Sequence, residues 1–175
     1  MNTQYENPWF KVVRDGKFHY VVENKADNGA AVLALLEGEA FLMLRLKRAA
    51  HPGIQQEIPR GYGEPDETSL ACARRELAEE TGYLVDESQL SLLGQLKPNS
   101  AILASTIDLY LARVKHSDLS QQRDDEADAV ERVSLAEMRQ RLREGAIQDG
   151  FTLAALAHYF NSVNNGMESS TLTQA

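Results

Sequence analysis

Between Gly61 and Tyr83 the chain reads GYGEPDETSLACARRELAEETGY, a glycine-containing loop followed by a segment without proline or glycine up to Gly82. The second part predicts a helix over about residues 68–81, which Gly82 is suited to end in the left-handed conformation. Each helical residue turns the chain by about 100°, so three carboxylates fall within an arc of about 100°. These three residues are Glu76, Glu79 and Glu80.

This acidic helix face fits poorly with the simplest interpretation, a face that only contacts solvent. Glu79 and Glu80 lie in the last turn, where the helix dipole disfavours each carboxylate by about 0.3–1 kcal/mol. Glu76 and Glu80 form an i, i+4 pair of like charge, which is also unfavourable. Arg75 can pair with Glu79, but one arginine cannot neutralise three carboxylates. Local rules broken together are expected at functional sites, and Mg²⁺, which prefers carboxylate and phosphate oxygens, would remove the conflict.

The loop before the helix offers a further ligand. Gly61 and Gly63 allow the backbone to approach the carboxylates closely, so a carbonyl oxygen would be able to join a metal site. The alternative is that this glycine pair forms only a turn.

The spacing of the fixed residues resembles the signature of the Nudix hydrolases. Gly61 is followed after five residues by Glu67 and after seven more by the run REL-A-EE-T-G, residues 75–82. The one departure is Tyr83, where the signature more often has an aliphatic residue. The resemblance implies an α/β fold, an α/β/α sandwich with a mixed sheet. It also implies an enzyme, a metal-dependent pyrophosphatase that splits a nucleoside diphosphate linked to another moiety.

The resemblance also implies roles for the signature residues. Metal ligands would be Glu76, Glu79, Glu80 and the carbonyl of Gly61, with one glutamate positioning or deprotonating the attacking water. Mg²⁺ is the expected ion, and Mn²⁺ is a possible substitute. Arg75 belongs to the predicted catalytic group, where a salt bridge to Glu67 would hold the loop and the helix together rather than touch the substrate.

Residues outside the signature resemble the ADP-ribose pyrophosphatase subfamily. Pro98 lies 16 residues after Gly82, where that subfamily carries a marker proline, although a loop proline without a substrate role is the alternative. The EIPRG stretch, Glu57–Gly61, resembles the entry to the signature in the same subfamily. The implied reaction converts ADP-ribose to AMP and ribose 5-phosphate. The predicted substrate contacts are Arg48, Arg60, Glu57 and Pro98, with Arg48 and Arg60 binding phosphates, although surface arginines without a substrate role are the alternative.

Two other functions stay open. One is a Nudix hydrolase for another nucleoside diphosphate sugar or a dinucleotide, of the GDP-mannose type. Motifs typical of NADH and coenzyme A pyrophosphatases are missing, and no tyrosine lies between Tyr83 and Tyr110, where diadenosine polyphosphate enzymes tend to have one. The other is a non-catalytic nucleotide-sensing module, which would be expected to have lost signature carboxylates. This chain keeps all of them.

Composition narrows the partners. The chain has 175 residues and a net charge of -8, so it lacks the general basic surface that nucleic acid binding needs. Its single cysteine cannot form an internal disulfide. The longest apolar run, Ala30–Leu36, is far shorter than the about 20 residues that span a bilayer. We therefore expect a cytoplasmic protein with a small-molecule nucleoside diphosphate substrate and no membrane partner.

Three parts are expected along the chain. Residues 1–27 form an N-terminal strand segment, in which ENPWFKVVRDG resembles the strands that ADP-ribose pyrophosphatases use to form homodimers. Residues 28–162 form the hydrolase domain, and residues 163–175 a flexible tail. A late acidic stretch, Asp124–Asp128, lies where some relatives carry a glutamate that helps to activate water, although a solvated acidic loop is the alternative.

Hydrophobic patterning supplies the remaining elements. Strands are expected at Phe18–Val22, Ala30–Leu36, Phe41–Arg45, Glu57–Ile58, Leu90–Gln95, Ile107–Val114 and Val130–Val133. Helices are expected from Ser134, as a capping residue with Glu137, to about Glu144, and over Phe151–Phe160.

Overall fold

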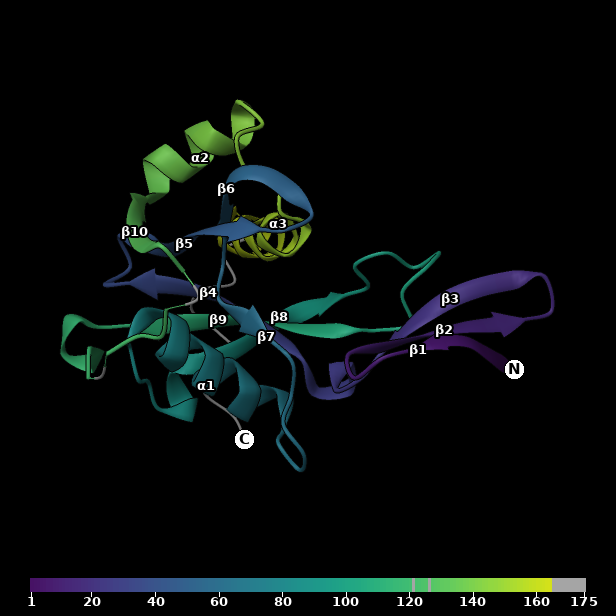
Figure 1. The fold of residues 1–175 in the computed structure, drawn as a ribbon. Helices are drawn as coiled ribbons and strands as arrows, with labels where there is room; N and C mark the ends of the chain where they lie inside the picture. Colours follow the sequence, from purple (N-terminus) through teal and green to yellow (C-terminus); the bar gives the residue numbers. More distant parts are fainter. Residues whose placement is uncertain (121, 126, 165–175) are drawn as a thin grey trace.

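A computed structural model describes residues 1–120, 122–125 and 127–164 (Figure 1). The main body is a seven-stranded sheet with helices on both faces. Its strands are β4 (Ala30–Leu36), β5 (Ala40–Arg48), β6 (His51–Glu57), β7 (Arg60–Gly61), β8 (Leu90–Leu96), β9 (Ile107–Val114) and β10 (Ala129–Ser134). The helices are α1 (Ser69–Thr81), α2 (Leu135–Arg143) and α3 (Gly150–Asn164), with short 3₁₀ turns at Ala26–Asn28, Glu87–Gln89 and His116–Asp118.

The sheet is mixed, as predicted. Its strand order is β10-β5-β4-β9-β8, with β6 paired to β5 and β7 paired to β4. The pair β4–β9 is parallel, and the other pairs are antiparallel. All seven residues of β4 are buried, because this central strand is covered on both faces. Its uninterrupted apolar sequence is the pattern expected of such a strand.

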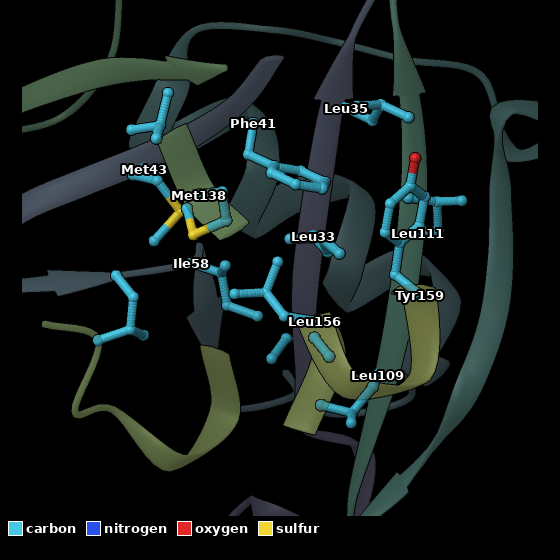
Figure 2. Close-up of a cluster of buried hydrophobic side chains, with 14 of the residues drawn as sticks. Leu33, Leu35, Phe41, Met43, Ile58, Leu109, Leu111, Met138, Leu156 and Tyr159 are labelled. Atoms are coloured by element: carbon cyan, nitrogen blue, oxygen red, sulfur yellow. The ribbon is translucent and has the colours of Figure 1, made fainter. Parts of the chain in front are cut away.

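Alternate residues of β4 pack against different helices, which makes the body an α/β/α sandwich. Leu33 and Leu35 face α3 and join a core cluster that includes Leu156, as Figure 2 shows. In the same cluster the rings of Phe41 and Tyr159 meet edge to face at 5.3 Å. Val32 and Ala34, among others, point to the opposite face and pack with residues of α1. The buried residues of α1 in that second cluster are Cys72, Ala73 and Leu77.

The N-terminal segment forms a separate antiparallel sheet of three strands, β1 (Asn2–Glu6), β2 (Phe10–Asp15) and β3 (Phe18–Glu23). In Figure 1 this sheet extends from one end of the body. Its attachment uses the backbone of Val21, whose N–H donates to the Ile102 carbonyl at 2.7 Å and whose carbonyl accepts from Ala104 N at 2.9 Å. The β3 strand is therefore joined to the loop of residues 97–106.

Several elements differ in extent from the sequence prediction. The segment predicted at Glu57–Ile58 is wrong in its bounds, since β6 covers His51–Glu57 and Ile58 follows it. This strand reads HPGIQQE, whose proline, glycine and polar residues are tolerated because it pairs only with β5. The short strand β7 was not predicted. Helix α3 continues past Phe160 to Asn164, and residues 165–175 of the predicted tail lie outside the described residues.

Helix α1 has the predicted ends. The Thr68 side chain accepts a hydrogen bond from Ala71 N at 3.1 Å, and Gly82 takes a left-handed conformation with φ 82°. Within the described ranges, no helix combines the length and the apolar character that crossing a membrane would require.

Candidate active site

The three signature glutamates do not form a solvated face. Glu80 is only 2% exposed, and its Oε2 accepts a hydrogen bond from the backbone N–H of Arg60 at 2.9 Å. The Glu76 carboxylate lies against Gly61, where an added Cβ would stand 2.0 Å from Glu76 Oε1. A side chain at position 61 would therefore displace the Glu76 carboxylate. Glu79 is the most open of the three, with a side chain 45% exposed.

Arg75 joins the glycine loop to the acidic face. Its Nη1 donates to Glu76 Oε1 at 2.7 Å and to Glu79 Oε2 at 3.0 Å. Its Nε and Nη2 donate to the two oxygens of Glu67, each at 3.0 Å, and Nη2 also donates to the Tyr62 carbonyl at 2.9 Å. The salt bridge expected between Glu67 and Arg75 is therefore present. The Glu67 hydrogen bond raises the pKa of Arg75, and the same bond lowers the pKa of Glu67.

The donor atoms in this region suit a hard divalent cation. Carboxylate oxygens from α1 and a nearby backbone carbonyl are ligands that Mg²⁺ accepts, together with water and substrate phosphates. The described residues contain no three His, Cys, Asp or Glu side chains already gathered as a metal cage, and Arg75 lies between Glu76 and Glu79. Mg²⁺ does not need such a cage, since one or two protein carboxylates plus phosphates suffice. The carboxylates of α1 and the nearby backbone carbonyl are therefore suitable ligands for Mg²⁺.

A second charged cluster contains three of the predicted substrate contacts. Glu57 is 3% exposed and accepts hydrogen bonds from Arg48 Nη2 and Arg60 Nη2, each at 2.8 Å. Burial would raise the pKa of Glu57, but the hydrogen bonds and charges of the two arginines outweigh it, so the pKa is lowered. Arg60 also stacks on the Phe151 ring at 4.3 Å, and its Nε is buried with no hydrogen-bond partner in the described part of the chain.

Arg60 connects the two clusters. Its backbone N–H binds Glu80, while its side chain binds Glu57. The carboxylate face of α1 and the arginine pair are therefore linked through the backbone of Arg60, whose side chain packs against Phe151 of α3. Carboxylates suit a metal ion, and arginines suit an anionic phosphate.

Comparison with known proteins agrees with this arrangement. A family model described as NUDIX domain matches residues 27–154. The chain belongs to the Nudix family. It is therefore an enzyme that hydrolyses pyrophosphate bonds in nucleotide-type substrates, in a family that typically uses a divalent metal.

The fold of this Nudix hydrolase is shared with solved structures. A crystal structure described as that of an ADP compounds hydrolase aligns with a TM-score of 0.71 and 19% sequence identity, covering 94% of this chain and 92% of that chain. No curated protein sequence matches the chain at a significant level.

Pro98, the fourth predicted substrate contact, lies elsewhere in the Nudix fold. It is half-buried in the loop of residues 97–106, which follows β8 and pairs with β3. This loop reaches the signature region through Glu23, whose carboxylate accepts from Ser105 Oγ at 2.6 Å and from the Tyr62 hydroxyl at 2.7 Å. Glu23, Tyr62 and Ser105 were not predicted, because no local pattern marks a contact between segments so distant in the sequence.

Asp124, the first residue of the predicted acidic stretch, lies beside the signature helix. Asp124 N donates to the Glu79 carbonyl at 2.7 Å, which brings this stretch to the C-terminal end of α1. Asp125 and Asp128 are exposed. Glu126 lies outside the described residues.

A single thiol lies directly behind the Nudix loop. Cys72 is fully buried, and its Sγ donates to the Gly61 carbonyl at 3.7 Å. Burial raises the pKa of this thiol to about 12. Cys72 packs as a small apolar residue between α1 and the sheet.

Proposed function

We propose that this Nudix hydrolase converts ADP-ribose to AMP and ribose 5-phosphate with Mg²⁺. The observation that carries the proposal is the junction at Arg60, which ties the carboxylate Glu80 to the arginine cluster around Glu57. The EIPRG stretch and Pro98 resemble the corresponding residues of ADP-ribose pyrophosphatases. The fold is shared with a protein described as an ADP compounds hydrolase, and ADP-ribose is an ADP compound.

The metal would be held by Glu76, Glu79, Glu80 and the carbonyl of Gly61, with Mn²⁺ able to replace Mg²⁺. When bound, a divalent cation neutralises phosphate charge and lowers the pKa of a coordinated water. Arg75 keeps the carboxylates and the glycine loop in place through its bonds to Glu67, Glu76 and Glu79.

Arg48 and Arg60 would bind the phosphates. Their side chains are 29% and 27% exposed, so each has a surface that a ligand can reach, while Glu57 holds both in position from the buried side. Guanidinium groups suit this task because they make paired hydrogen bonds to phosphate oxygens. One signature glutamate takes a proton from the attacking water, and the water oxygen bonds to one phosphorus. The bond from that phosphorus to the bridging oxygen breaks and releases the two monophosphates.

A second candidate is a substrate with the same pyrophosphate but another base or sugar, such as a GDP-mannose-type sugar or a dinucleotide. The position of Pro98 supports this second candidate, because Pro98 lies on the loop that is hydrogen-bonded to β3. It does not lie within the cluster of Arg48, Glu57 and Arg60. A non-catalytic nucleotide sensor is less well supported, since every signature carboxylate is present.

A substrate panel tests the proposal. Purified protein is assayed with ADP-ribose, GDP-mannose, NADH and diadenosine polyphosphates, with and without Mg²⁺. Fastest release of AMP and ribose 5-phosphate from ADP-ribose, only with metal, supports it. Faster hydrolysis of another compound keeps the site and replaces the substrate.

We also propose that the N-terminal segment, residues 1–27, forms a homodimer interface. The sheet β1–β3 extends from the body (Figure 1). The N-terminal segment that contains it exposes three aromatic residues. These are Tyr5 (55% exposed), Trp9 (69%) and Phe18 (66%). Aromatic side chains are enriched at protein–protein interfaces. Light scattering on the full chain should give twice the mass of 19.5 kDa, and a monomer at micromolar concentration would contradict the proposal.

A further inference from the structure

The first turn of α3 holds the backbone just before the glycine loop. Thr152 is fully buried, and its hydroxyl accepts a hydrogen bond from Ile58 N at 3.1 Å while donating to Asp149 Oδ2 at 2.7 Å. The same Asp149 oxygen accepts from Thr152 N at 2.8 Å. An ordinary helix cap would require only this last bond. The bond to Ile58 leads out of the helix into the segment between β6 and β7.

The same turn also contacts the Arg60 side chain. Asp149 Oδ1 lies 3.7 Å from Arg60 Nη2, and the Phe151 ring lies 4.3 Å from the guanidinium carbon. The segment 58–60 is thus held by α3 at its first residue through the backbone and at its last through the side chain. Between them, the Pro59 carbonyl accepts from Val32 N of the central strand at 2.8 Å.

Arg60 passes this restraint to the catalytic helix. Its backbone N–H is the donor to Glu80 Oε2 at 2.9 Å, so a shift of the segment would move that donor away from Glu80. Outer partners of this kind orient the groups that act on a metal or substrate.

We propose that Asp149 and Thr152 are positioning residues, which hold segment 58–60 so that the Arg60 amide fixes the Glu80 carboxylate. The catalytic consequence rests on the function proposed above. The structural coupling between the start of α3 and the Arg60 amide does not rest on that function, and it can be measured separately.

Hydrogen exchange of single amides, followed by NMR on the full chain, tests the coupling. Thr152→Val removes the hydroxyl with little change of shape, Thr152→Ser keeps it, and Asp149→Asn keeps a capping oxygen but removes the charge facing Arg60. Ser134→Ala is a matched control: Ser134 accepts from Glu137 N at 3.2 Å and caps α2, which carries none of the proposed catalytic residues.

In Thr152→Val we expect faster exchange at both Ile58 and Arg60 and a loss in kcat of about 10–100-fold, the range for lost outer partners, with KM nearly unchanged. Thr152→Ser should restore both readouts, and Asp149→Asn should accelerate exchange at Arg60 more than at Ile58. Unchanged Arg60 exchange in both Thr152→Val and Asp149→Asn, or a kcat loss no larger than that of Ser134→Ala, overturns the proposal. Should Thr152→Val fail to fold, the exchange rate of the Arg60 amide in Asp149→Asn alone decides whether the proposal holds. A wild-type protein inactive on every substrate would refute the proposed function, and the exchange rates would still decide the positioning role.

Discussion

Replacing Gly61 with alanine should separate activity from stability. Gly61 does not have a positive φ, so alanine can adopt its backbone conformation. The added methyl group would instead meet the Glu76 carboxylate, at 2.0 Å from Oε1, 2.2 Å from Cδ and 2.5 Å from Oε2. Reaching an ordinary contact of 3.4 Å requires the nearest oxygen to move by about 1.4 Å.

The size of both effects follows from this displacement. Misplacing a reacting group by about 1 Å can reduce the rate about 100-fold, which corresponds to about 2.7 kcal/mol in the activation free energy. The cost in stability should be smaller, because the displaced atoms are the end of a flexible side chain. Overpacking costs about 1–3 kcal/mol, and the lower entropy of the unfolded alanine chain recovers about 0.4–1 kcal/mol.

The assay compares kcat with ADP-ribose and the free energy of urea unfolding for wild type, Gly61→Ala and Gly150→Ala. Gly150 is a matched control, since a Cβ there meets no atom within 4 Å and its φ is not positive. We expect a loss of about 100-fold in kcat in Gly61→Ala alone, with unfolding lowered by about 2 kcal/mol or less. Activity above half of wild type in Gly61→Ala would refute the placement of Glu76 that underlies the proposed site.

Three further predictions concern the two charged clusters. Glu80→Gln keeps an oxygen that can accept a hydrogen bond from the Arg60 amide, so the free energy of unfolding should change little. The value of kcat should fall by more than the about 100-fold that loss of an outer partner costs. Intact activity would exclude Glu80 as a metal ligand. Burial raises the pKa of Glu57, but Arg48 and Arg60 hold it below the usual 4.5, so the unfolded chain takes up the proton first as the pH falls. The cluster's stabilisation should therefore be complete at pH 7 and decline below about pH 4.5, and urea unfolding across this range should show a smaller decline in Glu57→Gln; equal slopes would contradict this. Chelation with EDTA should abolish hydrolysis and added Mg²⁺ or Mn²⁺ should restore it, while activity that survives chelation would rule out the metal.

The parts of the fold that were predictable are those whose local sequence and tertiary environment agree. The apolar run Ala30–Leu36 is a strand with the predicted bounds because both of its faces are buried. The ends of α1 follow from Thr68 and Gly82, which satisfy or terminate the backbone hydrogen bonds locally. Strand β6 could not be found in this way, since its polar sequence becomes a strand only by pairing with β5.

The site shows the same division. Residue spacing alone indicated that Glu76, Glu79 and Glu80 share a helix face, because helical geometry fixes that relation. Spacing could not show that Glu80 is buried, since its partner Arg60 lies 20 positions earlier in the chain. The contact between Asp149 and Arg60 likewise depends on how α3 packs on the sheet.

The position of Cys72 makes this residue a natural probe of local opening in the enzyme. This thiol is the chain's one cysteine, has no exposed surface, and lies between α1 and the carbonyl of Gly61. An alkylating reagent can reach it only after α1 has moved away from the glycine loop or the sheet, or after the chain has unfolded. The rate of alkylation, compared with that of an unfolded chain, therefore measures how often this part of the molecule opens, without any engineered label.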